Sequence, residues 1–197
     1  MVAADKVFSL LKLNKGYLTS REAKENGVDN KILQRMTERG LIERAAHGLY
    51  IGTDIFPDSL YVAQYRCPKG VFSYETALFL HNLCDRYPFR FTMTIPSGWN
   101  TPMLTDDNFI FFYSRPEWMG LGVCETVTPS GVNVKAYDIE RTLCDCLRNA
   151  DKIDRDLAVT GLKRYVKSTG KDNAKLLKYA TALNIRDVMF RYLEVLS

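Results

Sequence analysis

Residues 19–50 constrain the fold of this chain more than any other segment, because they combine the signals of two short helices and a hairpin. Thr19 and Glu22 have the spacing of a capping box, in which each side chain bonds the other residue's backbone amide. A helix should therefore begin directly after Thr19 and end at Gly27, and Asp29 can cap a second helix. Two helices joined by so short a turn predict a helix-turn-helix.

The second helix of this motif should have one apolar and one polar side. Ile32, Leu33 and Met36 share a side, because successive helical residues are turned by about 100°. The opposite side and its flanks carry polar or charged residues: Asn30, Lys31, Gln34, Arg35 and Glu38. Asn and Gln pair bidentately with adenine, whereas Arg and Lys bind guanine or phosphates. The pattern predicts a DNA-reading helix that needs no cofactor.

A short β-hairpin should follow this helix. Residues 41–44 and 49–51 can pair across a turn at 45–48, which places Arg44 and His47 near the tip. Both side chains could contact backbone phosphate. The hairpin and the two helices together predict a winged helix-turn-helix. A protein-binding winged helix with a solvated polar face is the alternative.

The chain of 197 residues allows one large or two modest domains, and we expect two. Residues 52–58 contain Gly and Pro without periodicity and form the only plausible connector. We therefore predict an N-terminal domain over residues 1–53 and a second domain over residues 54–197. The fold class is α+β, with the winged helix followed by a mixed α/β domain.

The second domain should contain a four- to five-stranded sheet. A short strand is expected at residues 71–73, and residues 89–95 alternate in the period of a half-buried strand. Residues 108–113 are almost continuously apolar, which predicts a central strand. Two more strands should flank the turn at 128–131. Further helices are predicted over residues 5–13, 59–66, 74–81, 138–147, 153–165, 173–182 and 185–196.

The two ends of the chain are basic. Residues 1–52 hold nine Lys or Arg against six Asp or Glu, residues 53–150 hold eight against eleven, and residues 151–197 hold ten against six. Cations on the outer faces of adjacent C-terminal helices could attract RNA, a nucleotide or an acidic partner. A merely solvated face is the alternative. The cations concerned are Lys163, Arg164, Lys167, Lys171, Lys175 and Lys178.

Nothing in the sequence indicates a metal, a disulfide framework or a membrane segment. The five Cys include no Cys-x-x-Cys pair, and with only two His they make no convincing zinc site. They should be reduced thiols, which favours a cytoplasmic protein. No run approaches 18 apolar residues, and the first residues lack the features of a signal peptide.

An enzymatic function has little support in the motifs. The chain has no G-x-S-x-G, Walker A, G-x-G-x-x-G or H-E-x-x-H sequence. A metal-dependent nuclease is the enzymatic alternative, because residues 133–135 resemble the acid-x-Lys half of such a site. Asn133 stands where the carboxylate would be needed to bind the metal. Asp106 and Asp107 are adjacent, so they should point to different faces and act as loop solubilisers.

Several motifs give the chain a resemblance to the AbiEi family antitoxins of bacterial abortive-infection, type IV toxin–antitoxin systems, which act in phage defence. Residues 20–23, 33–41 and 47–50 are similar to the winged helix of that family. In the second domain the similar segments are residues 71–78, 80–83, 85–86, 88 and 139–145.

This resemblance implies an antitoxin that represses its own operon by binding inverted repeats in promoter DNA. Its C-terminal domain would counter a nucleotidyltransferase toxin without forming a stable complex with it. A plain winged-helix regulator with an interaction domain is the alternative. We expect no enzymatic activity, and the basic C-terminal surface is the candidate antitoxin surface. The residues expected to contact DNA are Ser20, Arg21, Asn30, Lys31, Gln34, Arg35, Arg44 and His47.

Overall fold

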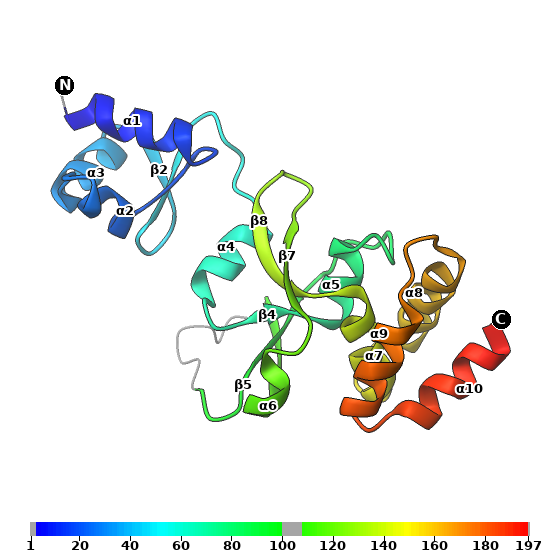
Figure 1. The fold of residues 1–197 in the computed structure, drawn as a ribbon. Coiled ribbons are helices and arrows are strands. Elements are labelled where there is room, and N and C mark those ends of the chain that lie inside the picture. Colours follow the sequence, from blue (N-terminus) through cyan, green and yellow to red (C-terminus); the bar gives the residue numbers. More distant parts are fainter. Residues whose placement is uncertain (1–2, 100–107, 197) are drawn as a thin grey trace. The chain divides into compact units, whose positions relative to one another are not determined.

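The computed structural model describes residues 3–99 and 108–196, and the chain forms two compact units, Met1–Arg66 and Cys67–Ser197 (Figure 1). No helix among these described residues is both long and apolar enough to cross a membrane. The first unit consists of α1 (Ala3–Leu13), β1 (Tyr17–Thr19), α2 (Ser20–Glu25), α3 (Asn30–Glu38), β2 (Ile42–Ala46), β3 (Leu49–Gly52) and α4 (Ser59–Arg66).

The capping signals predicted for α2 and α3 are confirmed. Thr19 Oγ1 accepts a hydrogen bond from the Glu22 amide at 3.1 Å, and Glu22 Oε2 accepts one from the Thr19 amide at 2.8 Å. At the start of α3, Asp29 Oδ1 accepts from the Lys31 amide at 2.7 Å. These bonds satisfy amides that have no partner within their own helix, so both helices begin at fixed residues.

A small apolar core holds the first unit together. Leu33 and Met36 of α3 are 0% and 4% exposed, and they pack with Val7 of α1 and Leu18 of β1. Ile32 is partly buried against the same core, so the apolar side predicted for α3 is confirmed. The opposite side of α3 therefore faces solvent.

The sheet of the first unit has three antiparallel strands in the order β1-β3-β2. β1 was not predicted, because three residues are too few to show an alternating pattern. The hairpin turn is also tighter than the predicted turn at 45–48. β2 extends to Ala46 through a bulge after Arg44, which leaves only His47 and Gly48 between the strands. Gly48 has a φ of +75°, which a residue without Cβ adopts at little cost.

The division between the units falls after Arg66, whereas the predicted domain boundary lies after residue 53. α4 belongs to the first unit because its start is fastened to β1. The Tyr17 hydroxyl accepts a hydrogen bond from the Asp58 amide at 2.7 Å, and the Tyr17 and Tyr61 rings lie 4.4 Å apart. Gly and Pro around residues 52–57 thus mark a turn within a unit.

The second unit is a mixed α/β fold around a five-stranded sheet with the order β6-β5-β4-β8-β7. The strands β5 and β6 are parallel, as are β4 and β8, and the other pairs are antiparallel. Its elements are β4 (Val71–Phe72), α5 (Tyr74–Leu80), β5 (Phe91–Pro96), β6 (Phe109–Ser114), α6 (Pro116–Met119), β7 (Val123–Val127), β8 (Asn133–Tyr137), α7 (Ile139–Arg148), α8 (Arg155–Lys167), α9 (Asn173–Ala182) and α10 (Arg186–Leu196).

The prediction that residues 108–113 form a central strand is wrong. β6 lies at the edge of the described sheet, and β4 is central. The apolar run of β6 is aromatic, and its rings stack on one another instead of filling two buried faces. Phe109 stacks on Phe111 with ring centroids 5.4 Å apart, and Phe112 stacks on Tyr74 at 3.8 Å. Tyr113 remains 60% exposed.

Four helices, α7 to α10, group together beside the sheet (Figure 1). α7 is their centre, with α5, α8 and α9 packed against it. Sequence spacing predicted an amphipathic α7, yet every residue from Glu140 to Leu147 is buried. Cys144 and Cys146 are buried free thiols, as expected of small core residues. Buried charges on α7 therefore need partners inside the unit.

Candidate nucleic-acid interface

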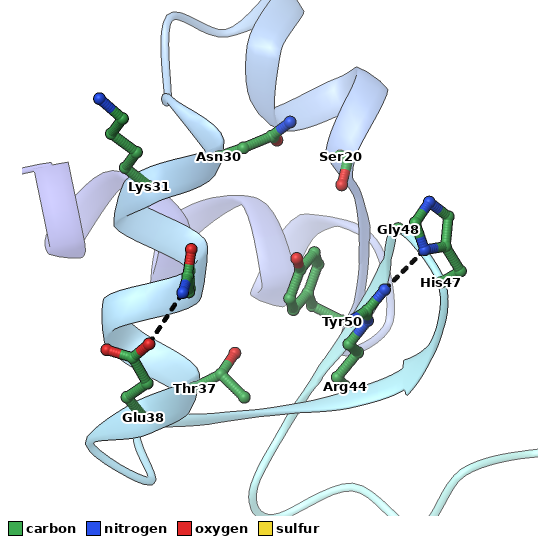
Figure 2. A pocket seen from close by; sticks show the side chains of 10 residues that line it. Ser20, Asn30, Lys31, Thr37, Glu38, Arg44, His47, Gly48 and Tyr50 are labelled. Atoms are coloured by element: carbon green, nitrogen blue, oxygen red, sulfur yellow. Dashed lines mark hydrogen bonds between the residues drawn. The ribbon is translucent and has the colours of Figure 1, made fainter.

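A hollow of about 490 Å³ lies in the first unit between α3 and the β2–β3 hairpin (Figure 2). Amides, hydroxyls, a carboxylate and two kinds of cation surround it. These are the groups with which proteins contact base edges and phosphates. The lining residues are Ser20, Asn30, Lys31, Gln34, Thr37, Glu38, Arg44, His47, Gly48 and Tyr50.

The exposed side of α3 supplies half of this lining. Asn30 and Lys31 come from the first turn, and Gln34 and Glu38 follow one and two turns later, all with exposed side chains. Gln34 Nε2 donates a hydrogen bond to Glu38 Oε1 at 2.9 Å (Figure 2). A carboxylate can only accept, so this bond fixes which end of the Gln34 amide faces Glu38.

The hairpin supplies the other side of the hollow. Arg44 Nη2 donates a hydrogen bond to His47 Nδ1 at 2.7 Å, and Arg44 Nε donates to the Ala46 carbonyl at 3.3 Å. A guanidinium cannot accept, so His47 Nδ1 is the acceptor of this hydrogen bond. The two side chains are thus joined at the hairpin tip.

The hairpin tip is fastened to the start of α2. The Gly48 carbonyl accepts from the Ser20 amide at 2.8 Å. A Cβ placed on Gly48 would lie 3.1 Å from the Tyr65 hydroxyl and 3.5 Å from Ser20 Oγ. A side chain at position 48 would therefore crowd the Tyr65 hydroxyl, and the positive φ of Gly48 would strain it.

The structure brings together six of the eight residues expected to contact DNA. These are Ser20, Asn30, Lys31, Gln34, Arg44 and His47. Arg21 and Arg35 lie outside the hollow, although both are exposed. Arg21 Nε pairs with Glu25 at 2.8 Å, and this hydrogen bond raises the pKa of Arg21. The Arg21 side chain therefore lies along the surface of α2, next to Glu25.

Sequence reasoning did not include Thr37 and Tyr50 in the site. Thr37 follows Gln34 by three residues, so helical spacing could have placed it on the same side. Tyr50 stands opposite Arg44 in the β2–β3 register and is 9% exposed. The cross-strand register, which the sequence does not display, puts this ring beside the cation.

The predicted basic surface of the second unit is only partly present. Lys163, Lys167 and Lys178 are exposed, but Arg164 pairs with Asp85, and Lys171 Nζ donates to the Val166 carbonyl at 2.7 Å. These two cations therefore have partners within the unit, which the helical spacing did not reveal.

Lys175 does not belong to an outward basic surface. Its Nζ lies 3.0 Å from Asp138 Oδ2 and 3.0 Å from Glu140 Oε2. Burial lowers the pKa of Lys175, but hydrogen bonds to both carboxylates outweigh it and hold the pKa above its usual value. Two acidic neighbours thus compensate the charge of Lys175. The prediction that Lys175 contributes to the basic surface is corrected accordingly.

The described residues can be compared with the metal-dependent nuclease alternative and with a role for His81. They contain no group of three or more His, Cys, Asp or Glu placed to hold a metal ion. His81 Nε2 bonds the Tyr137 carbonyl at 2.7 Å, and burial lowers the pKa of this imidazole. Asn133 and Lys135 lie on β8, and Lys135 Nζ donates to the Pro68 carbonyl at 3.4 Å. Asp106 and Asp107 lie outside the described residues.

Residues 5–51 match the family model described as "Transcriptional regulator, AbiEi antitoxin". This match confirms the resemblance over the segment that carries the hollow. No curated protein sequence matches the chain. A crystal structure of the RV2827C protein from Mycobacterium tuberculosis is similar, with a TM-score of 0.60 and 13% identity. The alignment covers 92% of this chain and 72% of that chain, and at this identity it shows a shared fold alone.

Proposed function

We propose that the first unit is a winged helix-turn-helix that binds double-stranded DNA. α3 would enter the major groove, and the β2–β3 hairpin would act as the wing against the backbone. The observation that carries this proposal is the hollow, where the polar side of α3 and the Arg44–His47 pair face a common space. The regulator family matched by residues 5–51 supports the same conclusion.

The test is a binding titration of the full chain with duplexes from its own promoter region. Fluorescence anisotropy should give affinity that falls as salt rises, because cations that neutralise phosphates release counterions. Promoter duplex should bind more tightly than a scrambled duplex of equal length. Equal, salt-independent values for both duplexes would favour a protein-binding winged helix. Cleavage that requires Mg²⁺ would favour the nuclease alternative.

The DNA-binding activity would serve repression of the protein's own operon at inverted repeats. This part of the proposal rests on the regulator description of the matched family. The wild-type chain should repress a promoter–reporter fusion, and the double variant Lys31→Ala, Gln34→Ala should fail to repress it. Scrambling one repeat should release the reporter as well. Silencing that survives both changes would contradict autorepression through α3.

The second proposed activity is that of a cytoplasmic antitoxin against a nucleotidyltransferase toxin, acting without a stable complex. The exposed cations Lys163, Lys167 and Lys178 support a basic surface on α8 and α9 that attracts an anionic substrate shared with the toxin. The rival is a plain regulator whose second unit is an interaction domain.

Co-expression with the toxin tests this second activity. Changing Lys163, Lys167 and Lys178 together to Glu should abolish rescue of growth while operator binding and the thermal melt stay near wild type. Arg164 and Lys175 are left unchanged because their charges hold partners inside the unit. Rescue by the charge-reversed chain would place the antitoxin activity elsewhere.

A further inference from the structure

Glu38 is an unusual member of a surface proposed to meet DNA, because its charge has the sign of the phosphates. It is exposed, lines the hollow and lies two turns after Lys31 on α3 (Figure 2). In the part of the chain that the structure describes, its carboxylate has no ion-pair partner and accepts one side-chain hydrogen bond, from Gln34. This negative charge therefore acts on whatever enters the hollow.

An uncompensated carboxylate in the major groove discriminates between base edges. It can only accept hydrogen bonds, so it needs a donor. The donors in the major groove are the N4 amino group of cytosine and the N6 amino group of adenine, whereas O6 and N7 of guanine and O4 of thymine are acceptors. A carboxylate that meets an acceptor is repelled and loses its hydration.

The bond between the two side chains also prepares Gln34. Gln34 Nε2 carries two hydrogens, so while one is donated to Glu38 the other can still be donated and the carbonyl oxygen can still accept. One donor and one acceptor are what a glutamine needs to bind N7 and N6 of adenine bidentately. Holding the amide in one orientation lowers the entropy that binding would cost.

We propose that Glu38 and Gln34 act as a coupled pair that selects a cytosine and an adenine at neighbouring positions of the operator. This inference rests on the proposed DNA-binding function and adds the sequence that α3 prefers. Residues four apart on a helix are separated by about one turn, roughly 5–6 Å. Base pairs are about 3.4 Å apart, so the two bases lie within one or two steps of each other.

A selection from randomised duplexes tests the pair in the full chain. The wild type should enrich cytosine at the Glu38 position by about 10-fold over other bases, with adenine nearby. Glu38→Gln should exchange the cytosine preference for adenine, because an amide donates as well as accepts. Glu38→Ala should remove the preference at that position and weaken the one for adenine, since Gln34 is no longer oriented. Gln34→Ala should remove the adenine preference alone.

Glu43→Gln is the matched control, because Glu43 is exposed on β2, lies outside the hollow and changes the net charge equally. It should raise affinity slightly for all duplexes and enrich the wild-type motif. If Glu38→Gln also enriches the wild-type motif, the pair does not select bases and the inference fails while the proposed function stands. A wild type that enriches no sequence and shows no salt-dependent affinity overturns the proposed function, and the pair with it.

Discussion

Arg141 Nε donates a hydrogen bond to Asp145 Oδ2 at 2.9 Å, and the two side chains are 0% and 1% exposed. Arg141 Nη1 also donates to the carbonyls of Trp118, at 2.7 Å, and Leu121, at 2.9 Å. Its guanidinium lies over the Tyr137 ring at 4.3 Å. The buried arginine thus connects α7 with β8 and with the segment around α6. Arg141 belongs to residues 139–145, one of the segments that resemble the family, and these contacts give it a structural role.

Arg141→Ala should destabilise the second unit by about 3 kcal/mol, because it removes the closer cation of the buried Asp145 carboxylate and leaves only Arg148, whose Nη2 lies 3.7 Å from Asp145 Oδ1. Burial already raises the pKa of Asp145, and Arg141 opposes that shift. Urea unfolding followed by circular dichroism measures the loss. The double change Arg141→Met with Asp145→Leu should cost less than the single change, because neither charge is then stranded. A larger loss in the double variant would contradict this account.

Acidification should destabilise the second unit through His81. Burial lowers the pKa of His81 in the folded chain, whereas the unfolded value is near 6.5. Between the folded and unfolded pKa values, the unfolded state therefore binds more protons than the folded state. The free energy of unfolding should keep its full value above about pH 6.5 and decrease as the pH falls below it. Thermal melts from pH 7.5 to 5 should show this decline. In His81→Gln the slope across that window should be shallower than in the wild type.

Lys31→Ala should weaken operator binding by about 1–3 kcal/mol if its ammonium contacts a base edge. Lys31 is exposed on the first turn of α3 and lines the hollow. Arg21→Ala is the control, because Arg21 is an exposed cation outside the hollow and is paired with Glu25. Anisotropy titrations of both variants should show the larger loss for Lys31→Ala. Equal losses would mean that the hollow does not distinguish the two cations.

Arg44→Ala should weaken binding to operator and scrambled duplexes by similar factors. Its guanidinium stands at the hairpin tip, where a phosphate contact carries no base information. The slope of log affinity against log salt should become shallower by about one. Salt titrations on both duplexes measure this. A loss confined to the operator would show that Arg44 reads bases instead.

Local signals predicted much of the first unit, because its helices are set by contacts between near neighbours. The bonds of Thr19 with Glu22 and of Asp29 with Lys31 span two or three residues, so the sequence displays them. The hollow depends on the cross-strand register of Arg44 and Tyr50 and on the fastening of Gly48 to Ser20. Those contacts depend on tertiary packing, so the sequence predicted six of the lining residues but not the hollow that they form.

The second unit was harder to predict for the same reason. An apolar run is typical of buried strands and so predicts a central β6, yet β6 is an edge strand, and its Phe112 stacks on Tyr74, far away in the sequence. Lys175 is predicted on the basic outer surface of the C-terminal helices because its helical neighbours include other lysines. Its partners Asp138 and Glu140 lie more than thirty residues earlier, and no spacing rule connects them.

The position of Lys175 leads to a prediction that separates structure from function. Lys175→Met should leave Glu140, which is 5% exposed, beside Asp138 without a cation. Tyr165 still donates to Glu140 at 3.2 Å, and Lys175 is 36% exposed on its side chain, so solvent screens part of the loss. The loss in free energy of unfolding should lie between the roughly 1 kcal/mol of an exposed ion pair and the 3 kcal/mol or more of a buried one.

Lys178→Met on the same helix is the control, because Lys178 is exposed, so this substitution should leave the melting temperature nearly unchanged. Equal melting temperatures for the two variants would show that the Lys175 contacts contribute nothing to stability, and Lys175 would then return to the candidate basic surface.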